Sequence, residues 1–212
     1  SQGGGGSPIL RGFEANRVLL VVDGVRMNNA IYRSGHLQNA ITLDPNIIDR
    51  VEVVFGSSSV GYGSDALGGV IHYFTKTPKL NAEKSFESTF SSAFNSANMG
   101  SMNNLTASFS TKKWGSISSF SFSNFGDIRM GKNRTHGFEN WGLTPVYSEN
   151  NRHFYKADQT VNPNPEIQKN TGYSQYDFFQ KFLYQIDTQN QLTVNLQYST
   201  SSDIDRFEIG RA

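Results

Sequence analysis

The sequence has no cysteine among its 212 residues, so a disulfide framework and a cysteine-ligated zinc or iron–sulfur site are both excluded. It also lacks an excess of charge, because 19 Lys and Arg face 18 Asp and Glu, for a formal net charge of +1. Proteins that bind nucleic acid carry a clear basic excess or stripe, so we expect no nucleic-acid partner. The longest plainly aliphatic run, Val18–Val22, is far shorter than the ~20 residues that a membrane-spanning helix needs.

Proline is scarce as well, with 6 residues, whereas glycine is frequent, with 20. Hydrophobic residues make up only 36% of the chain, yet aromatic residues reach 13%, including 16 Phe and 9 Tyr. Disordered chains are poor in aromatic residues, so extensive disorder is excluded. A polar, aromatic-rich composition of this kind is typical of an outer-membrane β-barrel as much as of a soluble β protein.

Motifs of common enzyme classes are also missing. Ser57-Ser58-Ser59 and the later Gly-Tyr-Gly-Ser-Asp lack the Gly-x-Ser-x-Gly order of a hydrolase. No lysine follows the glycines as a nucleotide-binding loop requires, and no pair of histidines has metal-ligand spacing on a helix. We therefore predict that the protein is not an enzyme and has no catalytic cofactor.

Residues 1 to about 80 contain short apolar runs separated by glycines. The runs at 18–22, 47–54 and 70–74 predict three strands, the first of which ends in a tight turn at Asp23-Gly24. The segment 57–62 is too rich in Ser and Gly to form a long helix. This half, 1–80, is interpreted as a small mixed α/β domain.

From about residue 84 the pattern changes to strict alternation of apolar and polar residues, which predicts strands with a different solvent on each face. Five segments of roughly ten residues follow it, and Phe179 and Leu183 interrupt the pattern in the fourth. Ten residues is the length of a tilted transmembrane strand, and the polar faces are rich in Ser, Thr, Asn and Gln. A soluble β-sandwich also alternates and remains the alternative at this point.

The connections favour the membrane barrel, because tight turns alternate with a long loop at about 126–175 that shows no clear secondary structure. We therefore predict an all-β transmembrane barrel, as a fragment of about five antiparallel strands in residues 81–212. The residues expected to face lipid are Phe86, Phe90, Phe94, Leu192, Leu196 and Tyr198.

The first half resembles the plug domain of TonB-dependent outer-membrane receptors. The matching motifs occur in order over residues 3–78: Ile9-Leu10-Arg11-Gly12-Phe13, Val18-Leu19-Leu20-Val21-Val22-Asp23-Gly24, Ile48-Asp49-Arg50-Val51-Glu52-Val53-Val54, and Tyr62-Gly63-Ser64-Asp65-Ala66-Leu67-Gly68-Gly69-Val70-Ile71. Two positions depart from the family pattern. Phe55-Gly56-Ser57 replaces the usual Arg-Gly-Pro, and Ile71-His72-Tyr73 replaces the usual Ile-Asn-Ile.

The resemblance implies active import of a scarce solute across the outer membrane of a Gram-negative bacterium. The plug would block the barrel lumen until the TonB energy-coupling complex acts on it, and outer-membrane lipid would surround the barrel. Haem or another iron complex is the expected solute, with a siderophore or cobalamin receptor as the alternative. A non-transporting adhesin or binding module with a β-sandwich is the alternative of another class. The early plug and the TonB-contacting segment are not found, so we expect a chain truncated at both ends.

The resemblance also assigns candidate residues. Ser34-Gly35-His36-Leu37, followed by Leu43-Asp44-Pro45, is similar to the plug apex of haem and haemoglobin receptors. His36 would there ligate haem iron, Tyr32 would stack on the porphyrin and Arg33 would pair with its propionates.

Two further sets are expected at other surfaces. Arg11, Arg50 and Glu52 are candidates for plug–barrel contacts, with ordinary pairing inside the plug as the alternative. His136, His153 and Trp141 in the long loop are candidates for contact with a ligand or an external haem-carrying protein.

Overall fold

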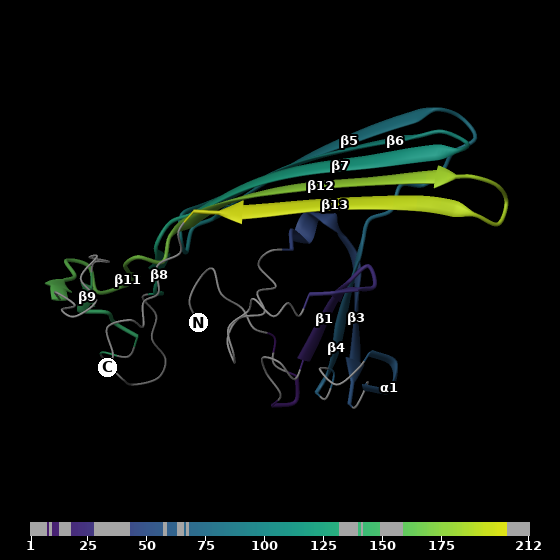
Figure 1. Ribbon diagram of the computed structural model, residues 1–212. Helices are drawn as coiled ribbons and strands as arrows, with labels where there is room; N and C mark the ends of the chain where they lie inside the picture. The colour runs from purple at the N-terminus through teal and green to yellow at the C-terminus, as the bar shows by residue number, and fades with distance from the viewer. Residues whose placement is uncertain are drawn as a thin grey trace.

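The computed structural model describes residues 8, 10–12, 18–27, 43–56, 59–62, 66, 68–131, 140, 142–148 and 159–202. They form a four-stranded N-terminal sheet, a five-stranded long sheet and two small strand pairs (Figure 1). In this part of the chain no helix has the length and apolar character needed to cross a membrane.

The N-terminal sheet has the strand order β2-β1-β4-β3. Its strands are β1 (Val18–Val22), β2 (Val25–Arg26), β3 (Ile48–Phe55) and β4 (Gly69–Thr75). β1 is parallel to β4 and every residue of it is buried, as expected for a continuous aliphatic run in a parallel pair. The three strands predicted from sequence are confirmed, and the described part of the Ser- and Gly-rich segment forms the four-residue helix α1 (Ser59–Tyr62).

Backbone geometry explains the presence of Asp23-Gly24 after β1 and of Gly69 at the start of β4. Asp23 and Gly24 both have positive φ, +47° and +84°, the geometry of the two-residue turn that joins β1 to β2. At Gly69, where φ is +142°, a Cβ atom would lie 2.5 Å from the carbonyl oxygen of Val54. Any other residue would therefore push β3 away from β4.

The long sheet contains the five alternating segments, in the order β13-β12-β7-β6-β5, and every neighbouring pair is antiparallel. The strands are β5 (Ser85–Asn95), β6 (Gly100–Ser110), β7 (Trp114–Phe125), β12 (Tyr173–Gln185) and β13 (Gln191–Ser201). Their lengths of 11 to 13 residues match tilted transmembrane strands. The prediction of five antiparallel strands after a small domain is confirmed.

Exposure across the long sheet is the reverse of that in a soluble protein. The outer face is apolar and exposed: Phe86, Phe90 and Phe94 are 65–68% exposed, and Leu192, Leu196 and Tyr198 are more than half exposed. The opposite face carries buried polar residues, among them Asn104, Ser119, Ser121, Asp177 and Lys181. An apolar exterior opposite a polar interior is the arrangement of an outer-membrane barrel.

The connections differ sharply in length, as predicted. The three residues 111–113 and the five residues 186–190 make tight turns at one end of the long sheet. At the other end, residues 96–99 form another short turn, and the described parts of the connection between 126 and 172 project away from the long strands (Figure 1). The expectation that this long loop lacks secondary structure is wrong, because backbone pairing joins β8 (Ile128–Arg129) to β11 (Ile167–Gln168) and β9 (Val146–Ser148) to β10 (Gln159–Val161).

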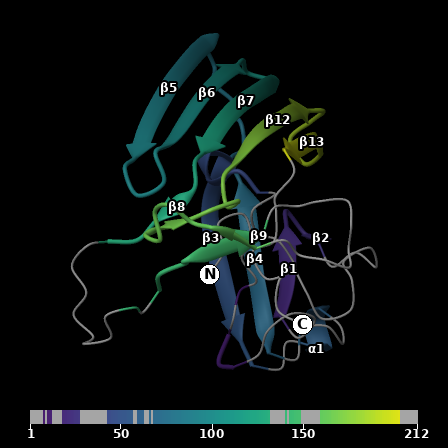
Figure 2. The same cartoon turned by 90° about the vertical axis from the view of Figure 1, so that its left-hand side faces the viewer.

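The N-terminal sheet lies against the polar face of the long sheet, as Figures 1 and 2 show from two directions. The 3-10 helix η3 (Pro45–Ile47) lies between them, and its Ile47 packs in one cluster with Ile117 and Phe179 of the long sheet. This contact explains why Phe179 interrupts the alternation. Its side chain is 2% exposed because it points to the N-terminal sheet rather than outward.

Candidate functional site

The contact between the two sheets gathers charged and polar side chains that are far apart in sequence. Asp23, in the turn after β1, meets Lys181 of β12 and Asn195 of β13. Asp44, just before η3, meets Ser121 of β7. We define these two groups, with Thr75, as the attachment site between the sheets.

Asp23 is the centre of the first group. Its Oδ2 atom lies 3.0 Å from Lys181 Nζ and accepts a hydrogen bond of 2.7 Å from Asn195 Nδ2. The Thr75 hydroxyl donates to Oδ2 at 2.5 Å, and the Thr75 backbone N–H donates to Oδ1 at 2.9 Å. The carboxylate therefore joins β4 to two strands of the long sheet.

Lys181 is buried on the polar face of β12, where its side chain is 4% exposed. Its ammonium group has three donors, and the structure gives them three acceptors: Asp23 Oδ2, the Thr75 carbonyl oxygen at 3.3 Å and Thr77 Oγ1 at 3.5 Å. A buried charge is tolerated when it is paired and hydrogen-bonded in this way. All three partners belong to the N-terminal half of the chain, so Lys181 depends on that half for its stability.

The pKa of Asp23 reflects two opposing effects, burial on one side and hydrogen bonds with a nearby cation on the other. Partial burial acts to raise it, but the hydrogen bonds from Thr75 and the proximity of Lys181 outweigh burial and hold the pKa below the usual 3.8. A carboxylate whose pKa is lowered by folding adds stability above the unfolded pKa, and that stability is lost as the pH falls through the folded value. Attachment through Asp23 should therefore persist down to about pH 4 and weaken in more acidic solution.

This pH dependence can be measured from the carboxyl carbon of Asp23 in NMR spectra of the protein. We expect its titration midpoint below 3.8 in the native chain and a higher midpoint in Lys181→Met. A midpoint that the substitution leaves unchanged would show that Lys181 does not stabilise the ionised carboxylate.

The second group is centred on Asp44, which is 4% exposed. Its Oδ2 atom accepts a hydrogen bond of 2.5 Å from Ser121 Oγ, and its Oδ1 atom accepts one of 2.9 Å from the backbone N–H of Asn46. The second bond caps η3, since Asp44 is the residue that precedes the helix. The same carboxylate thus fixes the local fold and joins it to β7.

An apolar cluster and a small cavity complete the contact. Val22, Leu43 and Ile47 pack with Ile117 and Phe179 across the two sheets. Beside them lies a cavity of about 230 Å³, lined by both apolar and polar side chains that include Ile47, Phe179, Asp44, Asp177 and Ser199. The contact therefore combines a limited apolar area with buried hydrogen bonds, rather than a continuous hydrophobic seal.

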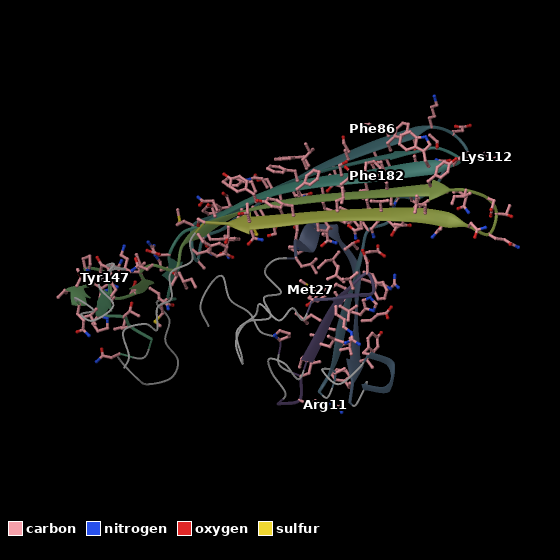
Figure 3. The ribbon with its side chains drawn as sticks, in the orientation of Figure 1. Arg11, Met27, Phe86, Lys112, Tyr147 and Phe182 are labelled. Atoms are coloured by element: carbon pink, nitrogen blue, oxygen red, sulfur yellow. The ribbon has the colours of Figure 1, made fainter. Side chains whose placement is uncertain are left out.

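The three residues predicted to attach the plug take other positions in the described structure. Arg50 Nε bonds Glu52 Oε1 at 2.9 Å, and the Arg50 guanidinium lies 3.7 Å above the ring of Phe74. The guanidinium of Arg11 lies 4.8 Å from the ring of Phe55, and Figure 3 shows Arg11 at the end of the N-terminal sheet away from the long sheet. These contacts lie within the N-terminal half of the chain. A contact with further wall strands stays a prediction.

The remaining predicted site residues lie outside the described residues. They are the apex residues Tyr32, Arg33 and His36 and the loop residues His136, Trp141 and His153. Their assigned roles stay predictions as well.

Sequence reasoning did not single out Asp23, Asp44 or Lys181. A signal was present for Lys181, because it is a lysine in the middle of the polar face of a long alternating strand. Such a cation needs a partner once a plug fills the lumen. The sequence identifies Asp23 only as a turn residue, although a turn at the end of a buried strand can also present its carboxylate to a second sheet.

The comparison with known families decides the identity of the N-terminal half. Residues 1–70 match the family model described as the TonB-dependent receptor plug domain. The chain belongs to the TonB-dependent receptor family. It is therefore an outer-membrane protein of a Gram-negative bacterium. The N-terminal sheet is the plug, and the long sheet is part of the barrel wall.

Relatives of this TonB-dependent receptor are described with different solutes. The chain is 50% identical over 66 residues to a hemin receptor of Yersinia enterocolitica, a match that covers 31% of this chain and 9% of the relative. It is 33% identical over 216 residues to the vitamin B12 transporter BtuB of Vibrio vulnificus, covering 95% of this chain and 32% of the relative. The chain thus spans about a third or less of the length of these relatives.

Solved structures of TonB-dependent receptors share the fold. The copper transporter OprC superposes with a TM-score of 0.67 at 15% identity, covering 94% of this chain and 26% of that one. The FrpB iron transporter of Neisseria meningitidis gives 0.62 at 18% identity, covering 92% and 26%. At these identities the likeness establishes the arrangement of plug and wall and leaves the solute open.

Proposed function

We propose that the complete protein imports a scarce solute across the outer membrane, with the plug as a gate, and that the solute is haem or another iron complex. The observation that carries the gating part is the attachment site. Asp23 and Asp44 hold the plug to the wall through hydrogen bonds and one ion pair, with only a small apolar cluster beside them.

The chemistry of this contact suits a gate. Separating two apolar surfaces exposes them to water at a cost that grows with their area. Separated polar groups, in contrast, can exchange their partners for water, so the net contribution of each hydrogen bond is only ~0.5–1.5 kcal/mol. A plug held mainly in this way is stable at rest and can be moved by a modest pull. The TonB energy-coupling complex is the proposed source of that pull.

Further contacts are proposed where the plug meets parts of a closed barrel that the long sheet does not form. Arg50 and Glu52 lie on β3, the edge strand of the plug sheet, and both side chains are more than half exposed. Together with Arg11 they are available to meet carboxylates or cations of further wall strands. Their present partners within the plug hold them in place for such contacts.

The haem assignment is supported by two findings. The segment around His36 resembles the apical plug segment of haem receptors, and a hemin receptor shares 50% identity over 66 residues. His36 is the proposed axial ligand, with Tyr32 and Arg33 contacting the porphyrin and its propionates. In the long loop, His136, His153 and Trp141 are the proposed contacts with the ligand or with an external haem-carrying protein.

Cobalamin is the second candidate solute, because the vitamin B12 transporter matches over 95% of this chain. An iron–siderophore complex is the other alternative solute, and it belongs to the iron complexes named above. Because the proposed role is transport through a gated lumen, no catalytic step is assigned to any residue.

The haem assignment is tested by titrating the purified complete receptor with haem and following its absorption spectrum. Replacing His36 by alanine should weaken haem binding by about 10-fold or more and change the spectrum, because an iron ligand is lost. Gln38→Ala, in the same segment, is the matched control and should bind as the native protein does. Unchanged affinity and spectrum in His36→Ala would remove His36 as the iron ligand, and a native receptor that binds no haem would remove haem as the solute.

Transport is tested separately, in cells that lack their own haem receptor and are given haem as the iron source. Growth should require both the receptor and TonB. Growth that continues without TonB would contradict gated import. Uptake of cobalamin, with no growth on haem, would instead support the second candidate.

A further inference from the structure

The outer face of the wall contains an apolar groove near the tight turns. It has a volume of about 300 Å³ and is lined by Trp114 and Gly115 of β7, Phe182 to Tyr184 of β12, and Leu192 and Val194 of β13. Its lining is almost wholly apolar and comes from three adjacent strands. Figure 3 shows Phe182 on the face of the wall that points away from the plug.

Strand register explains the groove. Phe182 is paired with Ser116 on one side and with Val194 on the other, so its ring stands beside smaller neighbours. One step nearer the turns, Tyr184 is paired with Trp114 and Leu192. Large aromatic rings thus border a hollow floored by shorter side chains. On the lipid-facing surface of a barrel, such a hollow is open to hydrocarbon chains rather than to water.

Positive charge lies at the end of the groove. Lys112 and Lys113 are exposed in the turn that precedes Trp114, and the carbonyl oxygen of Lys113 accepts a 2.7 Å hydrogen bond from the backbone N–H of Gln185. Lys79 and Lys84 are exposed in the segment whose Asn81 N–H bonds the Thr111 carbonyl oxygen at 3.0 Å. The three segments at this end, 79–84, 111–113 and 186–190, contain these four lysines and two acidic residues, Glu83 and Asp187. Their net charge is therefore positive.

We propose that this groove binds an anionic phospholipid, with one acyl chain against Trp114, Phe182 and Val194 and the phosphate group on Lys112 and Lys113. The tight turns of an outer-membrane barrel lie on its periplasmic side. The bound lipid therefore belongs to the inner leaflet. Trp114 and Tyr184 lie at the depth where an aromatic ring has one end in hydrocarbon and the other near the headgroups.

The test uses the complete receptor in detergent, with lipid binding counted by native mass spectrometry. The probes are phosphatidylglycerol and phosphatidylethanolamine with identical acyl chains. Phosphatidylglycerol should be retained more strongly by the native protein. Because a lysine near an anionic lipid contributes a factor of about five, the double variant Lys112→Gln/Lys113→Gln should lose about 20- to 30-fold in phosphatidylglycerol affinity. Its affinity for phosphatidylethanolamine should stay nearly constant.

Two further variants sharpen the test. Val194→Phe fills the groove and should weaken both lipids. Arg129→Gln/Lys169→Gln removes two charges from the opposite end of the wall and should bind both lipids as the native protein does. Equal retention of the two lipids by the native protein would overturn the proposal, as would an equal loss in both charge variants. A receptor dimer that replaces bound lipid and is lost in Val194→Phe would show a second copy to be the occupant and would also overturn it.

Discussion

Replacing Lys181 by methionine is expected to weaken the attachment of the plug to the barrel wall by about 3 kcal/mol. Methionine keeps most of the apolar stem of the lysine, so packing around the 4% exposed side chain is largely preserved. Asp23 would keep its bonds from Asn195 and Thr75 but would lose its cation. Removing one partner of a buried ion pair typically costs 3–5 kcal/mol. The lower end applies because the side chain of Asp23 remains 23% exposed.

The measurement is urea unfolding of the complete receptor in detergent, with protease cleavage of the plug as a second probe. Lys113→Met makes the same chemical change in an exposed turn and should have little effect. Asp23→Asn completes a double-mutant cycle, and asparagine tolerates the positive φ of this turn. If the effects of Asp23→Asn and Lys181→Met simply add, the two residues do not act as a pair and the attachment site loses its central contact.

Introducing arginine at Phe90 is expected to destabilise the protein in a bilayer by about 2–4 kcal/mol. Phe90 is 68% exposed and lies at the middle of the 11-residue strand β5, so its side chain should meet lipid near the bilayer midplane. In a soluble protein the same exposed position would tolerate the change within about 0.5 kcal/mol. The size of the effect therefore reports which solvent covers the outer face.

Folding into phospholipid vesicles, followed by urea titration, measures this free energy. Ser91→Arg is the matched control, because Ser91 is the next residue along the strand and points to the opposite, watered face. It should be nearly neutral. An equal and small effect at both positions would mean that neither face meets lipid, and the interpretation of the long sheet as a membrane wall would fail.

The strands could be predicted because each depends on a local pattern. β1 is a run of five aliphatic residues, and β13 alternates strictly from Leu192 to Tyr198. Alternation alone could not separate a membrane wall from a soluble sandwich, since both have two unlike faces. The length of the strands and the contrast between tight turns and one long connection favoured the wall, and the exposed Phe and Leu side chains agree with it.

The attachment site could not be predicted in the same way. Asp23 and Lys181 are separated by 158 positions, and each has an ordinary local explanation, as a turn residue and as a polar residue on a watered face. The sequence favours Arg50 and Glu52 instead, because they are charged and lie in a family motif. Their positions two residues apart on one strand allow them to pair with each other directly. Charged residues that are close in sequence can pair with each other, whereas Lys181 needs a partner that is distant in sequence.

Side-chain periodicity and motifs of neighbouring residues were enough to predict the main strands of both sheets, the outward face of the alternating strands and the family. The charged groups that hold the plug could be identified from three-dimensional contacts alone. Packing the plug against the wall removes water from Lys181, and the ammonium group must then find its acceptors among whatever residues the fold brings to it.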